Sequence, residues 1–375
     1  MMKPLALYIH IPFCRSKCIY CDFASYPNCE GRIEEYLAAV KGELSGWKKR
    51  LGEHEVTSVF IGGGTPSILS GHQIEDLLRA VRRVVRVSTD AEITMEANPG
   101  TVDFRKLQIC RRAGVNRVSF GAQSMDDRLL KKLGRIHTAA EIAEAVDMAR
   151  EAGFDNVSLD LMYALPGQTT AHWYDTLDKA IALKPEHISA YSLIVEEGTP
   201  MYDLVESGAV SLPSDENVIK MQQIAIERLE KAGYARYEIS NYARPGRECR
   251  HNIVYWQRGE YLGVGCAAHS LMDGVRFENP RDLGEYLSGV CRCDEVRLTA
   301  EDEMEEMLML STRMTRGLDL NAYREQFGVD FADKHEKSIR RLQQLDLIRL
   351  EDGFLSLTAR GLEVQNAVVV ELLEE

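Results

Sequence analysis

Short apolar runs alternate with longer amphipathic stretches from the start of the chain to about residue 240. The apolar runs have the length of buried strands, and the stretches between them repeat apolar positions at helical spacing. The predicted strands are Leu5–Ile11, Val56–Ile61, Glu92–Glu96, Arg117–Phe120, Val157–Met162 and His187–Leu193, and the predicted helices include Ile33–Arg50, Ile74–Val87, Ala139–Ala152 and Asn217–Ala232. Strand-then-helix repetition favours a parallel sheet with helices outside it. Six such units predict an α/β fold over residues 1–240, an incomplete (β/α)6 barrel of the TIM type.

The pattern changes twice after residue 240. Residues 241–294 lack helical periodicity and are rich in Arg, Asn, Tyr, Trp, Gly and His, so we expect a connecting segment there. The sequence of residues 295–375 predicts three helices, at Met304–Thr315, Asp319–Phe327 and Asp333–Leu345. A hairpin around Gly353 and a final helix follow them. Helices followed by a two-stranded wing predict a small winged-helix-like α+β domain.

The formal net charge of −13 bears on the class of ligand. Contacts to phosphates need clustered Lys and Arg, so an acidic chain is a poor binder of nucleic acid. Residues 295–375 hold 18 acidic and 10 basic residues, which favours a packing or lid role over DNA binding. The acidic run Glu301–Glu306 instead suits the positive end of a helix. The sequence has no run of about 18 uncharged apolar residues, so we expect no transmembrane helix.

Three cysteines, Cys14, Cys18 and Cys21, follow the first predicted strand in the spacing C-x3-C-x2-C. The segment Met1–Pro4 shows no hydrophobic signal region, so we expect a reducing, cytoplasmic compartment, where clustered cysteines usually bind metal. A four-iron cluster normally takes four thiolates, and three leave one iron open for a small molecule. A disulfide, simple burial or a zinc site with His10 as fourth ligand are the alternatives.

Glycines and polar groups follow the other predicted strands at their carboxyl ends, where barrel enzymes gather their chemistry. Gly62–Pro66 follows the second strand, and glycine serves both a close approach to a ligand and an ordinary turn. Glu96 ends the third strand, Gln123 follows the fourth, and Arg135 suits a carboxylate ligand. Asp160 lies inside an apolar strand, where a carboxylate needs either a ligand or an internal partner.

The cysteine spacing and the glycine run resemble the radical S-adenosylmethionine (SAM) superfamily. The resemblance implies that Cys14, Cys18 and Cys21 hold a [4Fe–4S] cluster and that SAM occupies the open iron. It also implies a contact between the glycine run and SAM. The narrower resemblance described next implies the SAM contacts, which are Tyr8, Tyr20, Gly63, Gly64, Thr65, Glu96, Gln123, Arg135 and Asp160.

The resemblance narrows to the oxygen-independent coproporphyrinogen III oxidase group on the segments Tyr8–Cys14, Tyr20–Phe23, Gly62–Pro66, Ser119–Gln123, Leu133–Thr138 and Asp160–Gln168. In the oxidase some of the SAM contacts serve a second SAM, which stays an open question for this chain. Phe23 stands where the oxidase has a further cysteine, and only 13 residues precede Cys14, where the oxidase carries a long extension. Both departures resemble the HemW group, heme chaperones related to the oxidase.

The segment Arg250–Trp256 carries the H-N-x-x-Y-W pattern associated with heme binding in that chaperone group. The resemblance implies heme contacts at His251, Asn252, Tyr255 and Trp256. An imidazole can ligate heme iron, and aromatic rings can cover the porphyrin face.

Other interpretations of this region remain. A histidine beside Tyr and Trp is commonly a packing element, which is the alternative for His251. Cys249 and Cys266 are alternative heme ligands, and His269 is equally a supporting or structural group.

These features predict a cytoplasmic protein that binds a cluster and SAM, and the resemblance implies that it also binds heme and hands it to respiratory apoproteins. Membrane contact is expected to be peripheral, through partners, and a homodimer is implied by the resemblance alone. One rival function is the anaerobic oxidative decarboxylation of coproporphyrinogen III. A second is radical chemistry on another large molecule such as RNA, against which the acidic balance argues.

Overall fold

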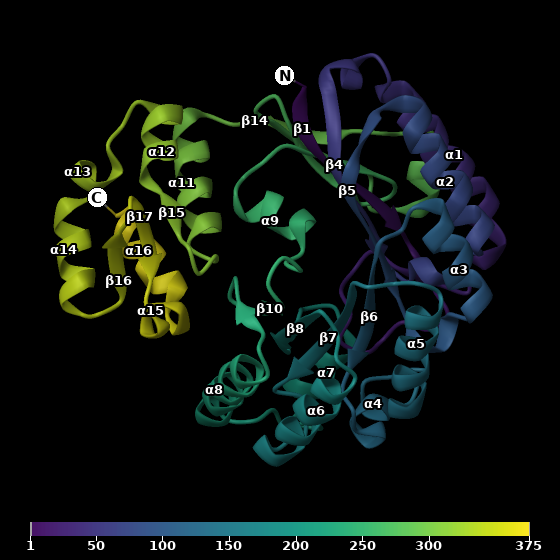
Figure 1. Ribbon diagram of the computed structural model, residues 1–375, viewed down its shortest axis with the longest axis horizontal. Coiled ribbons are helices and arrows are strands. Elements are labelled where there is room, and N and C mark those ends of the chain that lie inside the picture. The colour runs from purple at the N-terminus through teal and green to yellow at the C-terminus, as the bar shows by residue number, and fades with distance from the viewer. Residues whose placement is uncertain (1, 375) are drawn as a thin grey trace.

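A curved sheet of 12 strands organises the computed structural model, which describes residues 2–374 (Figure 1). Its middle consists of parallel strands in chain order, which are β1 (Lys3–Ile11), β4 (His54–Gly63), β5 (Arg86–Ala97), β6 (Arg117–Gln123), β7 (Val157–Tyr163) and β8 (His187–Ser192). Each strand pairs with the next, so every connection crosses back over one face of the sheet. The predicted α/β partial barrel is confirmed.

Helices cover the convex face of this sheet, as Figure 1 shows. They are α1 (Ile33–Trp47), α2 (Gly71–Val84), α3 (Phe104–Ala113), α4 (Asp127–Lys132), α5 (Ala139–Glu151), α6 (Thr170–Ala182), the short α7 (Pro200–Glu206) and α8 (Asp215–Lys231). The predicted extension of α2 to Val87 is wrong, because the β-branched Val85 already has extended backbone and β5 begins at Arg86. Among residues 2–374, no helix is both long and apolar enough to cross a membrane.

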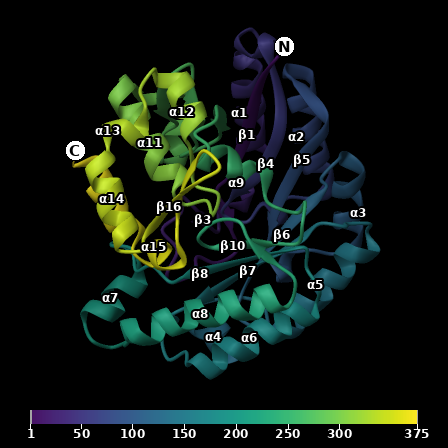
Figure 2. The ribbon, with the colours of Figure 1, turned by 60° about the vertical axis from the view of Figure 1, so that its left-hand side comes forward.

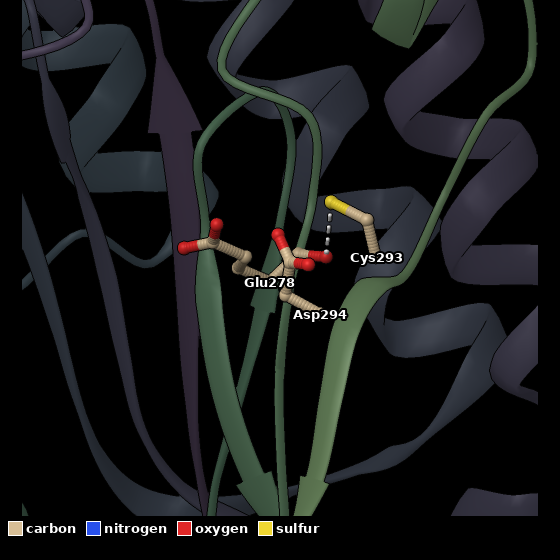
Figure 3. A group of neighbouring side chains, drawn as sticks. All are labelled: Glu278, Cys293 and Asp294. Carbon is tan, nitrogen blue, oxygen red and sulfur yellow. Dashed lines mark hydrogen bonds between the residues drawn. The ribbon is translucent and has the colours of Figure 1, made fainter.

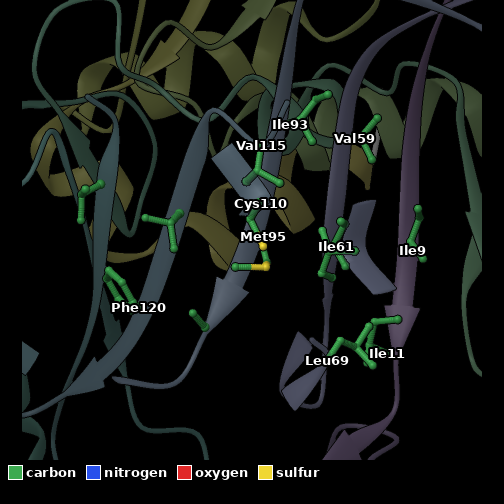
Figure 4. Packing of buried hydrophobic residues seen from close by; sticks show 14 of the residues in the cluster. Ile9, Ile11, Val59, Ile61, Leu69, Ile93, Met95, Cys110, Val115 and Phe120 are labelled. Atoms are coloured by element: carbon green, nitrogen blue, oxygen red, sulfur yellow. The ribbon is translucent and has the colours of Figure 1, made fainter. Parts of the chain in front are cut away.

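The main core lies between the sheet and these outer helices (Figure 4). Ile9 of β1, Ile61 of β4 and Met95 of β5 are fully buried beside one another. Strands buried on both faces read as continuous apolar runs, which is why the sequence located them. The packed core fixes the strand ends, and the residues that follow them, in one place.

The sheet continues beyond the parallel strands at both edges. Next to β1 lie β11 (Tyr261–Val264), β12 (His269–Met272), β13 (Val275–Glu278) and β14 (Cys293–Arg297), and next to β8 lie β10 (Asn241–Ala243) and β9 (Ala235–Arg236). Much of the predicted connecting segment is therefore part of the sheet, and β14 runs across the predicted boundary at residue 294. The three-part domain division stays a prediction.

The C-terminal residues form a small α+β module with its own apolar cluster. Its elements are α11 (Ala300–Ser311), β15 (Leu318–Asp319), α12 (Leu320–Phe327), α13 (Phe331–Lys334), α14 (Glu336–Gln344), β16 (Ile348–Glu351), β17 (Phe354–Leu357), α15 (Ala359–Glu363) and α16 (Gln365–Leu373). The helix predicted over Asp333–Leu345 is two helices that meet at His335. Figures 1 and 2 show the module on the concave side of the sheet, beyond the short helix α9 (Arg250–Trp256).

Candidate functional site

The three clustered cysteines lie on the loop that follows β1. The short strand β2 (Phe13–Cys14) anchors the first of them, and the backbone N–H of Cys21 donates to the carbonyl of Cys18 at 3.1 Å. The Sγ of Cys14 lies 3.4 Å from the hydroxyl of Thr65, and Arg135 donates to the Sγ of Cys18 at 3.5 Å. Burial raises the pKa of the Cys14 and Cys21 thiols, so a bound metal has to displace their protons.

The glycine run that ends β4 packs directly against the cysteine loop. Gly63 has a φ of 110°, and a Cβ there would lie 2.5 Å from the imidazole of His10. At Gly64 a Cβ would lie 2.7 Å from the carbonyl oxygen of Phe13 and 3.1 Å from the Sγ of Cys14. Both positions therefore require glycine, because a side chain would push the two loops apart.

Two carboxyl groups lie in neighbouring parts of the sheet, Glu96 near the carboxyl end of β5 and Asp160 in the middle of β7. Glu96 accepts the backbone N–H of Gly63 at 3.0 Å, and burial followed by the charge of Asp160 raises its pKa to about 8. Asp160 accepts hydrogen bonds from Ser189 at 2.7 Å and from Ser119 at 3.0 Å. Hydroxyl groups thus satisfy Asp160, and burial raises its pKa.

Cations approach the same region from two other positions. Arg135 donates to the carbonyl of Gly121 at 2.5 Å, and its buried Nε has no hydrogen-bond partner among residues 2–374. Arg117 is only 2% exposed and carries a positive charge towards Asp160. The sequence analysis missed Arg117, whose signal is a basic residue at the start of a buried strand.

These groups surround one cavity of about 490 Å³ on the concave side of the sheet. This volume is within the usual range of ligand pockets. Every predicted site residue except Trp256 lines it, namely Tyr8, Cys14, Cys18, Tyr20, Cys21, Gly63, Gly64, Thr65, Glu96, Gln123, Arg135, Asp160, His251, Asn252 and Tyr255. The cavity also has lining residues that the sequence analysis did not single out, among them Ser189 and Tyr191. We call it the cluster cavity.

The helix α9 carries the H-N-x-x-Y-W motif into this cavity. His251 is 1% exposed and stacks on Phe60 at 5.1 Å between ring centroids. Its Nδ1 shares a hydrogen bond with the hydroxyl of Ser58 at 2.9 Å, and its Nε2 shares another with Tyr255 at 2.9 Å. Burial lowers the pKa of His251 to about 3. Both ring nitrogens are engaged, so ligation of an iron by His251 requires the loss of one hydrogen bond.

The residues of the H-N-x-x-Y-W motif lie in two different surroundings. Asn252 and Tyr255 line the cluster cavity together with His251. Trp256 lies under the guanidinium of Arg313, 4.5 Å from its ring centroid, where the C-terminal module meets the barrel. Cys249 is fully buried, with its Sγ 3.5 Å from Glu92.

Comparison with known proteins places the chain in a family. A model of the radical SAM superfamily matches residues 8–180, and a model of the HemN C-terminal domain matches residues 298–364. The chain is 37% identical to the heme chaperone HemW of Bacillus subtilis (strain 168), over 98% of this chain and 99% of that protein. It is 43% identical to the heme chaperone HemW of Escherichia coli (strain K12), over 76% and 78% of the two chains.

The chain belongs to the HemW family. Among solved structures it is similar to the coproporphyrinogen III oxidase HemN of Escherichia coli, a radical SAM enzyme. The match has a TM-score of 0.85 at 25% identity and covers 99% of this chain and 90% of the oxidase. This chain and the oxidase therefore share one fold.

Radical SAM membership implies a [4Fe–4S] cluster and SAM, and the residues present fit both. Cys14, Cys18 and Cys21 are free thiols on one loop, which is the donor set of a cluster with an open iron. The backbone of Gly64 lies close against Cys14, because a Cβ there would be 3.1 Å from the cysteine Sγ. The unpartnered Nε of Arg135 suits a carboxylate such as that of a methionyl group.

Proposed function

We propose that this protein is a heme chaperone that binds one [4Fe–4S] cluster and SAM in the cluster cavity, carries heme, and delivers it to respiratory apoproteins. The observation that carries the proposal is similarity over nearly the whole chain to proteins named as heme chaperones. Delivery from the cytoplasm, with peripheral membrane contact through partners, and a homodimer belong to the same proposal.

The cavity supports a division of roles among the residues. Cys14, Cys18 and Cys21 would hold the cluster, which supplies one-electron chemistry and an open iron when bound. Tyr8, Tyr20, Gln123 and the Gly63–Thr65 turn would border SAM. Carboxyl groups would accept hydrogen bonds from its ammonium and ribose hydroxyls, and a guanidinium would bind its carboxylate. These are Glu96, Asp160 and Arg135, all of which line the cavity.

Anaerobic reconstitution tests the cluster. The protein should take up about four irons with the absorption of a [4Fe–4S] centre, and serine at Cys14, Cys18 or Cys21 should reduce that content. Serine at Cys110, a fully buried residue of α3, is the control and should leave the iron content unchanged. Equal iron content in all four variants would refute the assignment of the ligands.

Heme transfer tests the function itself. The reconstituted protein is loaded with heme and mixed with a heme-free respiratory oxidase in vesicles, and oxidase activity is followed with time. Activity should rise with loaded protein and remain low with an equal amount of free heme held on albumin. An equal rise in oxidase activity with both heme sources would contradict the chaperone function.

The similarity to the coproporphyrinogen III oxidase favours a second candidate, the oxidative decarboxylation of coproporphyrinogen III. Incubation with coproporphyrinogen III, SAM and a reductant under anaerobic conditions separates the two. The chaperone proposal expects no product with vinyl groups. Formation of protoporphyrinogen over many turnovers would replace the proposal with the enzyme.

A further inference from the structure

A second cavity, of about 410 Å³, lies on the other side of the cysteine loop. Its size is within the range of small-molecule sites. The lining residues used below are Tyr8, Phe23, Tyr255, Tyr261, His269 and Arg281. Tyr8, Phe23 and Tyr255 also line the cluster cavity, so these three side chains form a wall between the two spaces. We call the second space the outer cavity.

The histidines near this wall differ in whether their ring nitrogens are hydrogen-bonded. His251 has both nitrogens in hydrogen bonds, as described above. His10 is 5% exposed, with Nδ1 3.0 Å from the hydroxyl of Tyr8 and Nε2 2.8 Å from the carbonyl oxygen of Ala24. The side chain of His269 is 59% exposed and has one partner, Glu278, at 2.9 Å from its Nε2. Within residues 2–374, Nδ1 of His269 makes no hydrogen bond, so it is the accessible imidazole nitrogen.

Glu278 holds His269 from the neighbouring strand. The two residues lie directly opposite each other in the antiparallel pair of β12 and β13. A carboxylate on one ring nitrogen orients an imidazole and increases the basicity of the other nitrogen. Glu278 also lies beside Cys293 and Asp294 of β14 (Figure 3), but those groups are two carboxylates and a thiol at the partly exposed end of a strand, and we assign them no metal.

Aromatic and cationic groups complete the outer cavity. Phe23 is 64% exposed, unusually so for a large apolar side chain, and Tyr255 meets Tyr261 edge to face at 4.7 Å between ring centroids. Such surfaces match the face of a porphyrin. The exposed guanidinium of Arg281, which donates to the carbonyl of Asp22, is suited to a propionate.

We propose that heme binds in the outer cavity, with His269 as axial ligand, Phe23 and Tyr255 against the macrocycle, and Arg281 at a propionate. The inference rests on the proposed heme-chaperone function and names its binding site. It assigns ligation to His269 instead of His251, because the hydrogen bond between His251 Nε2 and the hydroxyl of Tyr255 keeps Tyr255 in place in the dividing wall. Heme and SAM then occupy adjoining spaces and do not compete for one.

Heme titration of the full-length, anaerobically purified protein tests this assignment. Wild type, His269→Ala, His251→Gln and the surface control His72→Ala are each titrated with hemin, and the Soret band, the spin state and the stoichiometry are recorded. His269→Ala should lose low-spin ligation and bind at least about tenfold more weakly. His72→Ala should match wild type, and His251→Gln should keep the ligated spectrum.

The outcomes separate the two proposals. Loss of ligation in His251→Gln or in Tyr255→Phe, with His269→Ala unchanged, would overturn the assignment while leaving the chaperone function intact. Absence of stoichiometric binding by wild type would instead contradict the chaperone function. Circular dichroism and iron content of each variant confirm that it is folded and carries its cluster.

Rescue of a cavity variant adds a second measurement. In His269→Gly, free imidazole should restore the low-spin spectrum in a saturable manner, because it can enter the space left by the side chain. The same addition to His251→Gly should leave the spectrum as it was. Failure of imidazole to restore ligation in a folded His269→Gly protein would count against His269.

Discussion

The carboxylate of Glu92 accepts the backbone N–H of His251 at 3.2 Å. Its second oxygen accepts the backbone N–H of Arg250 at 3.1 Å. A buried residue of β5 therefore caps the first turn of α9, and this helix of 7 residues is too short to be stable alone. One carboxylate thus fixes the motif helix inside the barrel.

Replacement of Glu92 by alanine should release α9. We expect the free energy of unfolding to fall by about 1–3 kcal/mol, because two helix N–H groups lose their acceptor. Amide hydrogen exchange across Arg250–Trp256 should accelerate in the same variant. Asp90→Ala is the control, since Asp90 contacts only the arginine of this helix and is exposed. Equal protection of α9 in both variants would show that Glu92 is not its anchor.

Alanine at Gly63 should disturb the cysteine loop through His10. The positive φ and the 2.5 Å approach to the imidazole predict a loss of about 2–4 kcal/mol in the free energy of unfolding and a lower iron content after reconstitution. Gly52→Ala has no neighbour within 4 Å and should behave as wild type. Normal iron uptake by Gly63→Ala would mean that the two loops can separate without cost.

The raised pKa of Glu96 predicts that the free energy of unfolding of the cofactor-free protein depends on pH in an unusual way. Its pKa is about 8 in the folded protein, raised from 4.5, so folding takes up a proton between these values. The free energy of unfolding should therefore fall as the pH rises from about 4.5 to about 8. Glu96→Gln should remove this slope and exceed wild type at pH 9 by on the order of 3 kcal/mol.

Chemical denaturation at pH 6 and pH 9 measures the Glu96 effect. The exposed carboxylate of Glu197 provides the control, and Glu197→Gln should keep the slope of wild type. If the difference between Glu96→Gln and wild type is the same at both pH values, Glu96 does not titrate in this range.

Glu306 of α11 joins the C-terminal module to the barrel. Its carboxylate binds Arg258, which follows α9, at 3.1 Å, and it also pairs with Arg276 of β13. The side chains of Arg258 and Glu306 are 8% and 14% exposed. Glu306→Ala leaves the buried Arg258 with Glu303, at 3.4 Å, as its remaining carboxylate partner. We therefore expect a loss of about 2 kcal/mol in the free energy of unfolding and faster proteolysis between the barrel and the module. Glu305→Ala, an exposed change on the same helix, should leave the cleavage rate unaltered.

Local patterns were sufficient to predict the parallel strands. Leu5–Ile11 and Val157–Met162 are apolar because both faces of each strand are covered. The predicted SAM and cluster residues meet in one cavity because the carboxyl ends of parallel strands lie at one edge of the sheet. The order of the strands along the chain was therefore enough to predict that these residues lie close together.

The elements that could not be predicted from the sequence depend on contacts between residues far apart in the chain. Strands such as Tyr261–Val264 are too short for a periodic signal, and they form because β1 offers an open edge. The helix at Arg250–Trp256 depends on Glu92, more than a hundred residues earlier. The outer cavity joins Phe23, His269 and Arg281, which no spacing rule connects.

The pairing of β1 with β11 has a bearing on how the protein matures in the cell. The hydroxyl of Tyr26 donates to the carbonyl oxygen of Arg281, and the hydroxyl of Tyr36 accepts the backbone N–H of Cys266. The surroundings of the cysteine loop therefore come from both ends of the barrel sequence. The cysteines leave the ribosome long before Tyr261 and Arg281 are synthesised. The lining residues of the cluster cavity extend along the chain as far as Tyr255. A nascent chain stalled before residue 250 would therefore have all the cysteines of the loop but lack the wall of the cavity that α9 provides.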